Sequence, residues 1–250
     1  FRRIIANSAM VQRDVCARYG IEPKDVVVIH NGVDLERFDR ARQAGGARQL
    51  RRELALEQAD PIVLFLGTGY GRKGLALVLA AFPELLAREP RAALVIAGFD
   101  SAERRFRARA AALGIEASVR FLGGRSDAER LYALADLYVL PTLYDPFANT
   151  TLEALASGLP VLTTDANGGS EILEPQVHGS VQSQAGGAAA LGASLVAWSG
   201  RERLESARSA TRALAERYPA QRTAALSADL LEEVSREKSR QDPPAARRYE

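Results

Sequence analysis

The chain alternates short, uninterrupted apolar runs with longer segments of helical periodicity, and this alternation limits its fold more than any other feature. The apolar runs lie at residues 3–6, 26–29, 62–66, 93–97, 119–122, 137–140 and 161–163. The helical segments lie near residues 8–19, 74–88, 101–113, 127–135, 150–157 and 169–173. Runs without polar alternation predict strands that are buried on both faces, as in a parallel sheet covered by helices. We therefore predict an α/β fold with a Rossmann-like parallel sheet flanked by helices.

The pattern changes after about Val181, where the sequence becomes rich in glycine and alanine. Helical periodicity then returns near residues 186–197, 201–217 and 220–238, so we assign residues 186–238 to a helical C-terminal extension. The charged, proline-containing residues 239–250 predict a flexible tail. Earlier in the chain, Gln43–Gly46 holds two glycines and predicts a loop before a helix near residues 47–55.

Charge and cysteine content exclude several classes of protein. The 33 basic residues nearly balance the 31 acidic ones, so no overall field favours a nucleic-acid partner. Cys16 is the single cysteine of the 250 residues, which excludes a disulfide framework. No apolar run approaches the roughly 20 residues of a membrane-spanning helix. We expect a soluble, cytoplasmic protein. Because the sequence starts at Phe1 and enters a strand-like run at once, we also expect it to continue a longer polypeptide.

A glycine-rich loop, Gly67-Thr68-Gly69-Tyr70-Gly71-Arg72-Lys73-Gly74, follows one buried run and opens the next helix. Glycines let the backbone approach a ligand closely, and a helix N-terminus offers unpaired N–H groups and a partial positive charge. Two adjacent cations can neutralise a diphosphate. The loop therefore predicts a phosphate site that depends on Arg72 and Lys73.

Other interpretations of this loop stay open. Gly69, Gly71 and Gly74 also match G-x-G-x-x-G, with Asp100 as the acid that would bind a ribose, as in an NAD-dependent oxidoreductase. Against it, Asp100 comes later than the usual interval of about 20 residues, and a dinucleotide site does not need two cations in the turn. The loop is not a Walker A motif, because Lys73 is followed by glycine. A plain glycine-rich turn with solvated cations is the remaining alternative.

A second group of polar residues lies between Leu140 and Pro160. A strand ends, a loop carries Asp145, and a helix begins at an Asn149 or Thr150 cap, with Glu153 in its first turn. Both carboxylates can then face one ligand and accept hydrogen bonds from its hydroxyl groups, while the N–H groups of residues 149–151 point toward an anion. Taken singly, Glu153 also fits an acid that compensates the helix dipole, and Asp145 a turn residue before proline.

Three motifs together resemble the family 4 retaining glycosyltransferases of the GT-B fold. They are His30-Asn31-Gly32-Val33-Asp34 with Phe38, the turn Arg72-Lys73-Gly74, and the acids Asp145 and Glu153 followed by the stretch through Val161. They occur in the family's order over residues 1–182 and are similar to its C-terminal, donor-binding half. The turn Gly71-Arg72-Lys73-Gly74 is most similar to the lipopolysaccharide core glucosyltransferases. One position departs from the family, which usually has glutamate where this chain has Asp145.

The resemblance implies a role for each motif. Arg72 and Lys73 would bind the donor diphosphate and, with Asp145, would be the catalytic residues. Glu153 would bind the ribose, and Asp145 with the loop after it the transferred sugar. The base would lie along residues 123–126, beside Gly98 and Phe99. The implied nucleotide-sugar site comprises Gly71, Arg72, Lys73, Gly123, Arg125, Asp145, Asn149, Thr150, Thr151 and Glu153. Neither a metal nor another cofactor is expected, and no metal-ligand cluster accompanies His30 or His178.

The implied activity is retaining transfer of a hexose from a nucleotide-diphosphate sugar, such as UDP-glucose, to a glycan or lipid-linked acceptor such as lipopolysaccharide core. Residues 1–20 would end an N-terminal, acceptor-binding domain or connect the domains, and residues 21–185 would form the donor domain. We expect the isolated chain to bind donor without transfer, and any peripheral contact with the inner face of the membrane to come from the missing half. A GT-B nucleotide-sugar epimerase, the oxidoreductase and a protein with a decayed donor site remain alternatives.

Overall fold

A six-stranded parallel sheet forms the centre of the protein, which we describe for residues 3–241 from a computed structural model, with side chains through residue 237. Its order is β5-β4-β3-β6-β7-β8. The strands are β3 (Ile62–Leu66), β4 (Ala93–Ala97), β5 (Val119–Phe121), β6 (Leu137–Leu140), β7 (Val161–Thr164) and β8 (Gly179–Gln182). The chain winds outward from β3 to β5 and returns to β6 on the other side. This reversal places a crevice at the carboxyl ends of β3 and β6.

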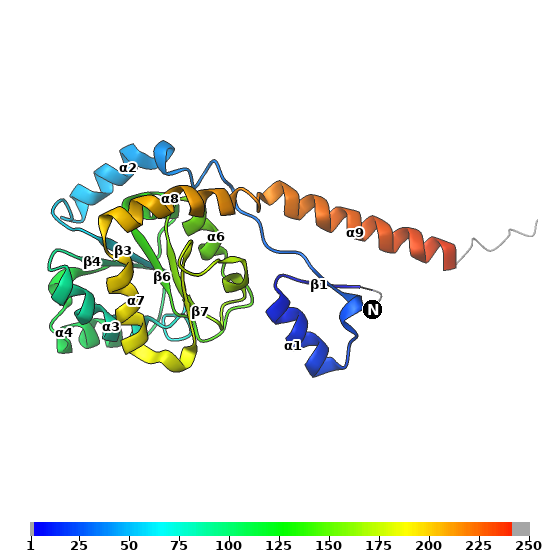
Figure 1. The fold of residues 1–250 in the computed structure, drawn as a ribbon, viewed down its shortest axis with the longest axis horizontal. Coiled ribbons are helices and arrows are strands. Elements are labelled where there is room, and N and C mark those ends of the chain that lie inside the picture. Colours follow the sequence, from blue (N-terminus) through cyan, green and yellow to red (C-terminus); the bar gives the residue numbers. More distant parts are fainter. Residues whose placement is uncertain (1–2, 242–250) are drawn as a thin grey trace, which may run out of the picture.

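Helices cover both faces of the sheet (Figure 1). One layer contains α3 (Leu75–Arg88), α4 (Glu103–Ala112) and α7 (Gly187–Trp198), and α3 packs on both α4 and α7. The other layer contains α2 (Arg40–Glu53), α5 (Ala128–Leu134), α6 (Asn149–Ala156) and α8 (Arg201–Ala215), packed as α2 on α5 and α6 on α8. Every residue of β4 and β6 is buried, because each faces a helical layer on both sides. The predicted α/β class and parallel sheet are confirmed.

Residues 3–30 form a separate small unit. Strands β1 (Ile4–Ala6) and β2 (Val26–Val28) pair in a parallel two-stranded sheet, and α1 (Ala9–Tyr19) connects them. The run near residue 26 thus belongs to this second sheet and not to the main one. The long helix α9 (Ala220–Gln241) leaves the main body and runs beside this unit (Figure 1). Gly32 gives α9 room, because a Cβ there would lie 2.6 Å from the Cα of Ala220.

Two local expectations differ from the structure. Gln43–Gly46 is not a loop, because α2 runs from Arg40 through both glycines. Asp39 caps that helix by accepting from the amides of Ala41 and Arg42, and Gly46 admits the side chain of Arg130 from α5. Strand β8 was missed, since its sequence Gly-Ser-Val-Gln has a single apolar residue besides the glycine.

At the C-terminus, α9 continues to Gln241, so the first three residues of the predicted tail are helical. The remaining residues of that tail, 242–250, lie outside the described part of the chain. Among residues 3–241, no helix combines the length and the apolar composition of a membrane-crossing segment.

Candidate functional site

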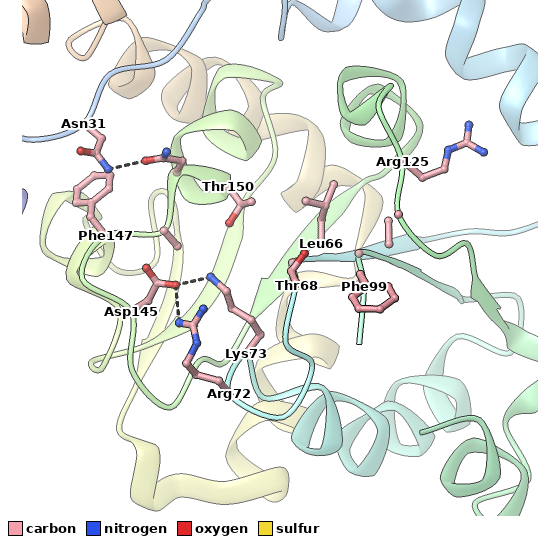
Figure 2. Close-up of a pocket in the computed structure, with 16 residues that line it drawn as sticks. Asn31, Leu66, Thr68, Arg72, Lys73, Phe99, Arg125, Asp145, Phe147 and Thr150 are labelled. Carbon is pink, nitrogen blue, oxygen red and sulfur yellow. Dashed lines mark hydrogen bonds and ion pairs between the residues drawn. The ribbon is translucent and has the colours of Figure 1, made fainter. Parts of the chain in front are cut away.

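A cavity of about 550 Å³ opens at the carboxyl ends of the central strands. Figure 2 shows the residues that surround it, which come from the ends of β3 and β4, from the loops after β3, β4, β5 and β6, from the start of α6, and from Asn31, a few residues after β2. The lining residues are Asn31, Leu66, Gly67, Thr68, Arg72, Lys73, Ala97, Gly98, Phe99, Gly124, Arg125, Asp145, Phe147, Ala148, Asn149 and Thr150. The cavity therefore occupies the crevice at which open α/β sheets bind ligands.

The glycine-rich loop and the loop after β6 are tied together by their backbones. Gly74 has a φ of 82° and lies so close to Pro141 that a Cβ would come within 2.0 Å of the Pro141 carbonyl oxygen. The amide of Leu143 and the hydroxyl of Thr142 both donate to the carbonyl of Arg72, at 2.8 and 3.0 Å. These contacts fix Arg72 and Lys73 at the cavity wall before any ligand contact is made.

Asp145 faces both cations of that loop (Figure 2). Its Oδ2 accepts hydrogen bonds from the Lys73 ammonium and, at 3.3 Å, from the Arg72 guanidinium. Asp145 and Lys73 are buried, whereas half of the Arg72 side chain is exposed. Two cations against one carboxylate leave this corner of the cavity with a net positive charge, which is favourable for an anionic ligand.

Helix α6 points its N-terminus into the same cavity. Its N-cap is Ala148, so the predicted cap at Asn149 or Thr150 is wrong by one or two positions. The side-chain oxygen of Asn149 already accepts a hydrogen bond, from the side-chain Nδ2 of Asn31 at 2.5 Å. The Thr150 hydroxyl is buried without a hydrogen-bond partner. The α6 N-terminus thus offers backbone N–H groups and one unused hydroxyl to a ligand.

Four residues of the predicted site do not line the cavity, namely Gly71, Gly123, Thr151 and Glu153. Thr151 is fully buried and accepts a hydrogen bond from Asn167. Contrary to the prediction, Glu153 is not in the first turn of α6, because the helix begins at Asn149 and Glu153 is its fifth residue. Its carboxylate accepts from the Tyr132 hydroxyl at 2.8 Å. Burial raises the pKa of Glu153, although the Tyr132 hydrogen bond partly opposes that shift.

This raised pKa gives a stability prediction for Glu153→Gln. A carboxyl whose folded pKa exceeds its unfolded value favours folding at acidic pH, and that contribution is lost as pH rises through the folded pKa. Glutamine keeps an acceptor for Tyr132 without a buried charge. We expect Glu153→Gln to unfold at the same or a higher temperature than wild type at neutral pH, with the difference vanishing in acid, where the carboxyl is protonated. A lower melting temperature at neutral pH, with exposed Glu57→Gln unchanged, would contradict this.

The opposite end of the cavity carries an exposed aromatic ring. Phe99 is 66% exposed and follows Gly98, which lies against the Gly67 backbone so closely that a Cβ would come within 2.1 Å of the Gly67 oxygen. Beside it, the Arg125 guanidinium makes two hydrogen bonds to Asp127, at 2.7 and 2.8 Å. The flat ring of Phe99 is suited to stacking on another planar group. Asp100 does not line the cavity, and its carboxylate accepts from the amide of Ala102.

Neither histidine lines the cavity. His30 Nε2 lies 2.7 Å from Glu171, and His178 Nδ1 accepts from the Glu174 amide. Within the described residues, no three His, Cys, Asp or Glu side chains gather into a metal site. Sequence reasoning gave no role of their own to Leu66 and Thr68, whereas Phe147 belongs to the loop after Asp145 that the resemblance assigned to the transferred sugar.

Structural comparison groups this fold with the glycosyltransferases of the GT-B fold. A glycosyltransferase from Rickettsia africae superposes with a TM-score of 0.84 at 20% identity, covering 93% of this chain and 63% of that one. Anabaena HepE in complex with UDP-glucose gives 0.82 at 23%, covering 93% and 64%. WaaG, a glycosyltransferase involved in lipopolysaccharide biosynthesis, gives 0.79 at 25%, covering 91% and 62%.

The chain belongs to the family described as glycosyl transferases group 1, whose model matches residues 47–210. A second model, glycosyltransferase family 4, matches residues 1–37. Among curated proteins, the lipopolysaccharide glucosyltransferase WaaG of Escherichia coli is 32% identical over 65% of this chain and 46% of its own length. An uncharacterized glycosyltransferase of Methanocaldococcus jannaschii is 31% identical, over 71% and 46%. The chain thus spans about half the length of these relatives, and the resemblance noted from its motifs is confirmed.

Proposed function

We propose that the cavity binds the nucleotide-diphosphate sugar of a glycosyl transfer reaction. The observation that carries the proposal is the meeting of Arg72, Lys73 and Asp145 with the N-terminus of α6 in one cavity. A diphosphate needs cations and N–H donors together, and both are present here. Phe99, Gly124 and Arg125 then form the base end of the site, and Asp145 the sugar end. Glu153 and the Thr150 hydroxyl serve the ribose.

The donor we propose is a UDP-hexose. HepE was solved with UDP-glucose, and WaaG of E. coli is a lipopolysaccharide glucosyltransferase. We propose a glycan or lipid-linked acceptor, bound mainly by a part of the protein outside this chain, in line with the coverage of its relatives. The β1–α1–β2 unit, which contains most of the predicted residues 1–20 and extends to Val28, then belongs to that acceptor side, and the six-stranded sheet with its helices to the donor domain. Any contact with a membrane surface would also come from that outside part.

The reaction we propose is transfer with retention at the anomeric carbon. Its largest requirement is stabilisation of the negative charge that develops on the departing diphosphate. Arg72, Lys73 and the α6 N-terminus supply positive charge for that purpose, so the proposed mechanism uses no metal ion. The leaving phosphate would take the acceptor proton on the same face of the sugar. Asp145 would hold hydroxyl groups of the transferred sugar.

The oxidoreductase alternative has less support. Its ribose acid, Asp100, accepts from the amide of Ala102 just before α4 and does not line the cavity, and Gly74 packs on Pro141. A titration panel separates the alternatives. We expect calorimetry on the full chain to detect UDP or another nucleoside diphosphate binding without added metal, and NADH not to compete. An absence of nucleotide binding would overturn the proposal, and an NADH fluorescence change unaffected by UDP would favour the oxidoreductase. Conversion of a UDP-sugar without acceptor would favour the epimerase.

A further inference from the structure

The first turn of α1 rests on the loop that carries Asp145. Ser8 is the N-cap of α1 and is completely buried. Its hydroxyl accepts a hydrogen bond from the Val11 amide at 3.1 Å and donates one to the carbonyl of Pro146 at 2.7 Å. A buried hydroxyl with both functions filled has one orientation, so the start of α1 and the Pro146 peptide are held as a pair.

Glu171 also binds the N-terminus of α1. It lies in the short 3-10 helix η3 (Gly168–Ile172), and its carboxylate accepts from the amide of Ala9 at 2.9 and 3.0 Å and from that of Met10 at 3.4 Å. Together with Ser8, it satisfies the first three N–H groups of the helix. An acid at a helix N-terminus is also favoured by the helix dipole. The position of the α1 N-terminus is therefore set by contacts with residues far away in the sequence.

The junction leaves little room for other positions of the loop. A Cβ at Gly168 would lie 1.9 Å from the Pro146 carbonyl oxygen and 2.5 Å from the Ser8 hydroxyl oxygen. The Gly168 amide donates to the Asp145 carbonyl at 2.8 Å, and the Asp145 amide donates to Ala166 at 2.9 Å. The main chain of Asp145 and Pro146 is thus enclosed between α1 and the segment around η3.

Tyr144, which precedes Asp145, is also hydrogen-bonded to α1. The Tyr144 hydroxyl donates to the carboxylate of Asp14, further along α1, at 3.0 Å. Tyr144 is 45% exposed, so this hydrogen bond can be removed without disturbing the core. The residues on both sides of Asp145 are therefore bonded to α1, one through a buried group and one through an exposed group.

We propose that Ser8 is a positioning residue for Asp145, and that the Asp14–Tyr144 hydrogen bond supports it. Through these two contacts, the position of the β1–α1–β2 unit sets how the Asp145 carboxylate is presented to the donor sugar. The backbone at the diphosphate end of the site is held by contacts that do not involve α1, from Thr142 and Leu143 to the carbonyl of Arg72, whereas the side chains of Arg72 and Lys73 also contact the Asp145 carboxylate. The proposal rests on the proposed function, because it assigns Asp145 to the sugar end of the donor.

The test compares UDP with UDP-glucose, both titrated into the full chain by calorimetry. The quantity of interest is the ratio of the two dissociation constants, which measures what the sugar adds to binding. We expect Ser8→Ala to leave the dissociation constant of UDP within about twofold and to reduce the sugar's contribution at least fivefold. Tyr144→Phe should change the ratio in the same direction by a smaller factor. Arg13→Ala, at an exposed position of α1, is the matched control.

A double variant separates positioning from a general loss of structure. If Ser8 acts through Asp145, then Ser8→Ala should have no further effect on the ratio in an Asp145→Ala background. An equal loss in both backgrounds, or an unchanged ratio in Ser8→Ala and Tyr144→Phe, would overturn the proposal. If Ser8→Ala does not fold, Tyr144→Phe alone decides it by the same criterion. If the wild-type chain binds UDP and UDP-glucose equally tightly, only the positioning role is overturned. If it does not bind UDP, the proposed function is overturned as well.

Discussion

Replacing Lys73 with alanine is expected to weaken UDP binding by about 1–3 kcal/mol, or from about fivefold to more than a hundredfold. The Lys73 side chain is only 11% exposed, so its charge acts on a phosphate with little screening by solvent. The side chain of its neighbour Arg72 is 52% exposed and should contribute less. The expected order of loss is therefore Lys73→Ala first and Arg72→Ala second, measured by calorimetry at constant ionic strength.

Two controls make this result specific. Lys24→Ala removes a lysine whose side chain is 73% exposed, and it should leave UDP binding unchanged. Lys73→Ala also removes the principal counter-ion of the buried Asp145, so unfolding by urea should be followed in parallel. A folded Lys73→Ala protein that binds UDP as tightly as wild type would contradict the role assigned to this residue.

Most of the central sheet was predictable because of how parallel sheets are buried. Strands such as Ile62–Leu66 and Ala93–Ala97 face helices on both sides, so every position is apolar and the strand is visible as an unbroken run. Edge strand β8 lacks that signal, because only its first residue is buried. The two glycines within α2 led to the wrong prediction of a loop. In the folded protein, close packing of Arg130 against Gly46 outweighs the weak helical propensity of glycine.

The site was only partly predictable from the sequence. Features formed by neighbouring residues could be predicted, and contacts between residues far apart in the sequence could not. Arg72 and Lys73 could be assigned because a strand, a loop and a helix start follow one another directly in the sequence around them. Asp145 was found as half of a motif, but its pairing with Lys73 joins positions 72 residues apart. The contacts of Ser8 with Pro146 and of Glu171 with Ala9 span 138 and 162 residues. No local pattern encodes such contacts, so the connection from α1 to the Asp145 loop became visible only in three dimensions.

Replacing Gly74 with alanine is expected to destabilise the protein by about 2–5 kcal/mol and to remove UDP binding at the same time. Its φ of 82° costs a residue with a Cβ about 1–2 kcal/mol. The added methyl would also lie 2.0 Å from the Pro141 carbonyl oxygen, a backbone atom that cannot rotate away. Forcing extra volume into such a contact typically costs a further 1–3 kcal/mol or so. Urea unfolding gives the stability, and calorimetry on the folded fraction gives the affinity.

Gly71 provides the matched control within the same loop. A Cβ added at Gly71 would meet no atom within 4 Å, and its φ is not positive, so Gly71→Ala should change the free energy of unfolding by less than about 1 kcal/mol. An equal effect of both substitutions would mean that the loop is sensitive to any side chain, and not to its contact with Pro141. If Gly74→Ala alone lowers stability and UDP affinity, the placement of Arg72 and Lys73 depends on the contact with Pro141. Displacement of the Pro141 backbone would also move the chain that leads to Asp145.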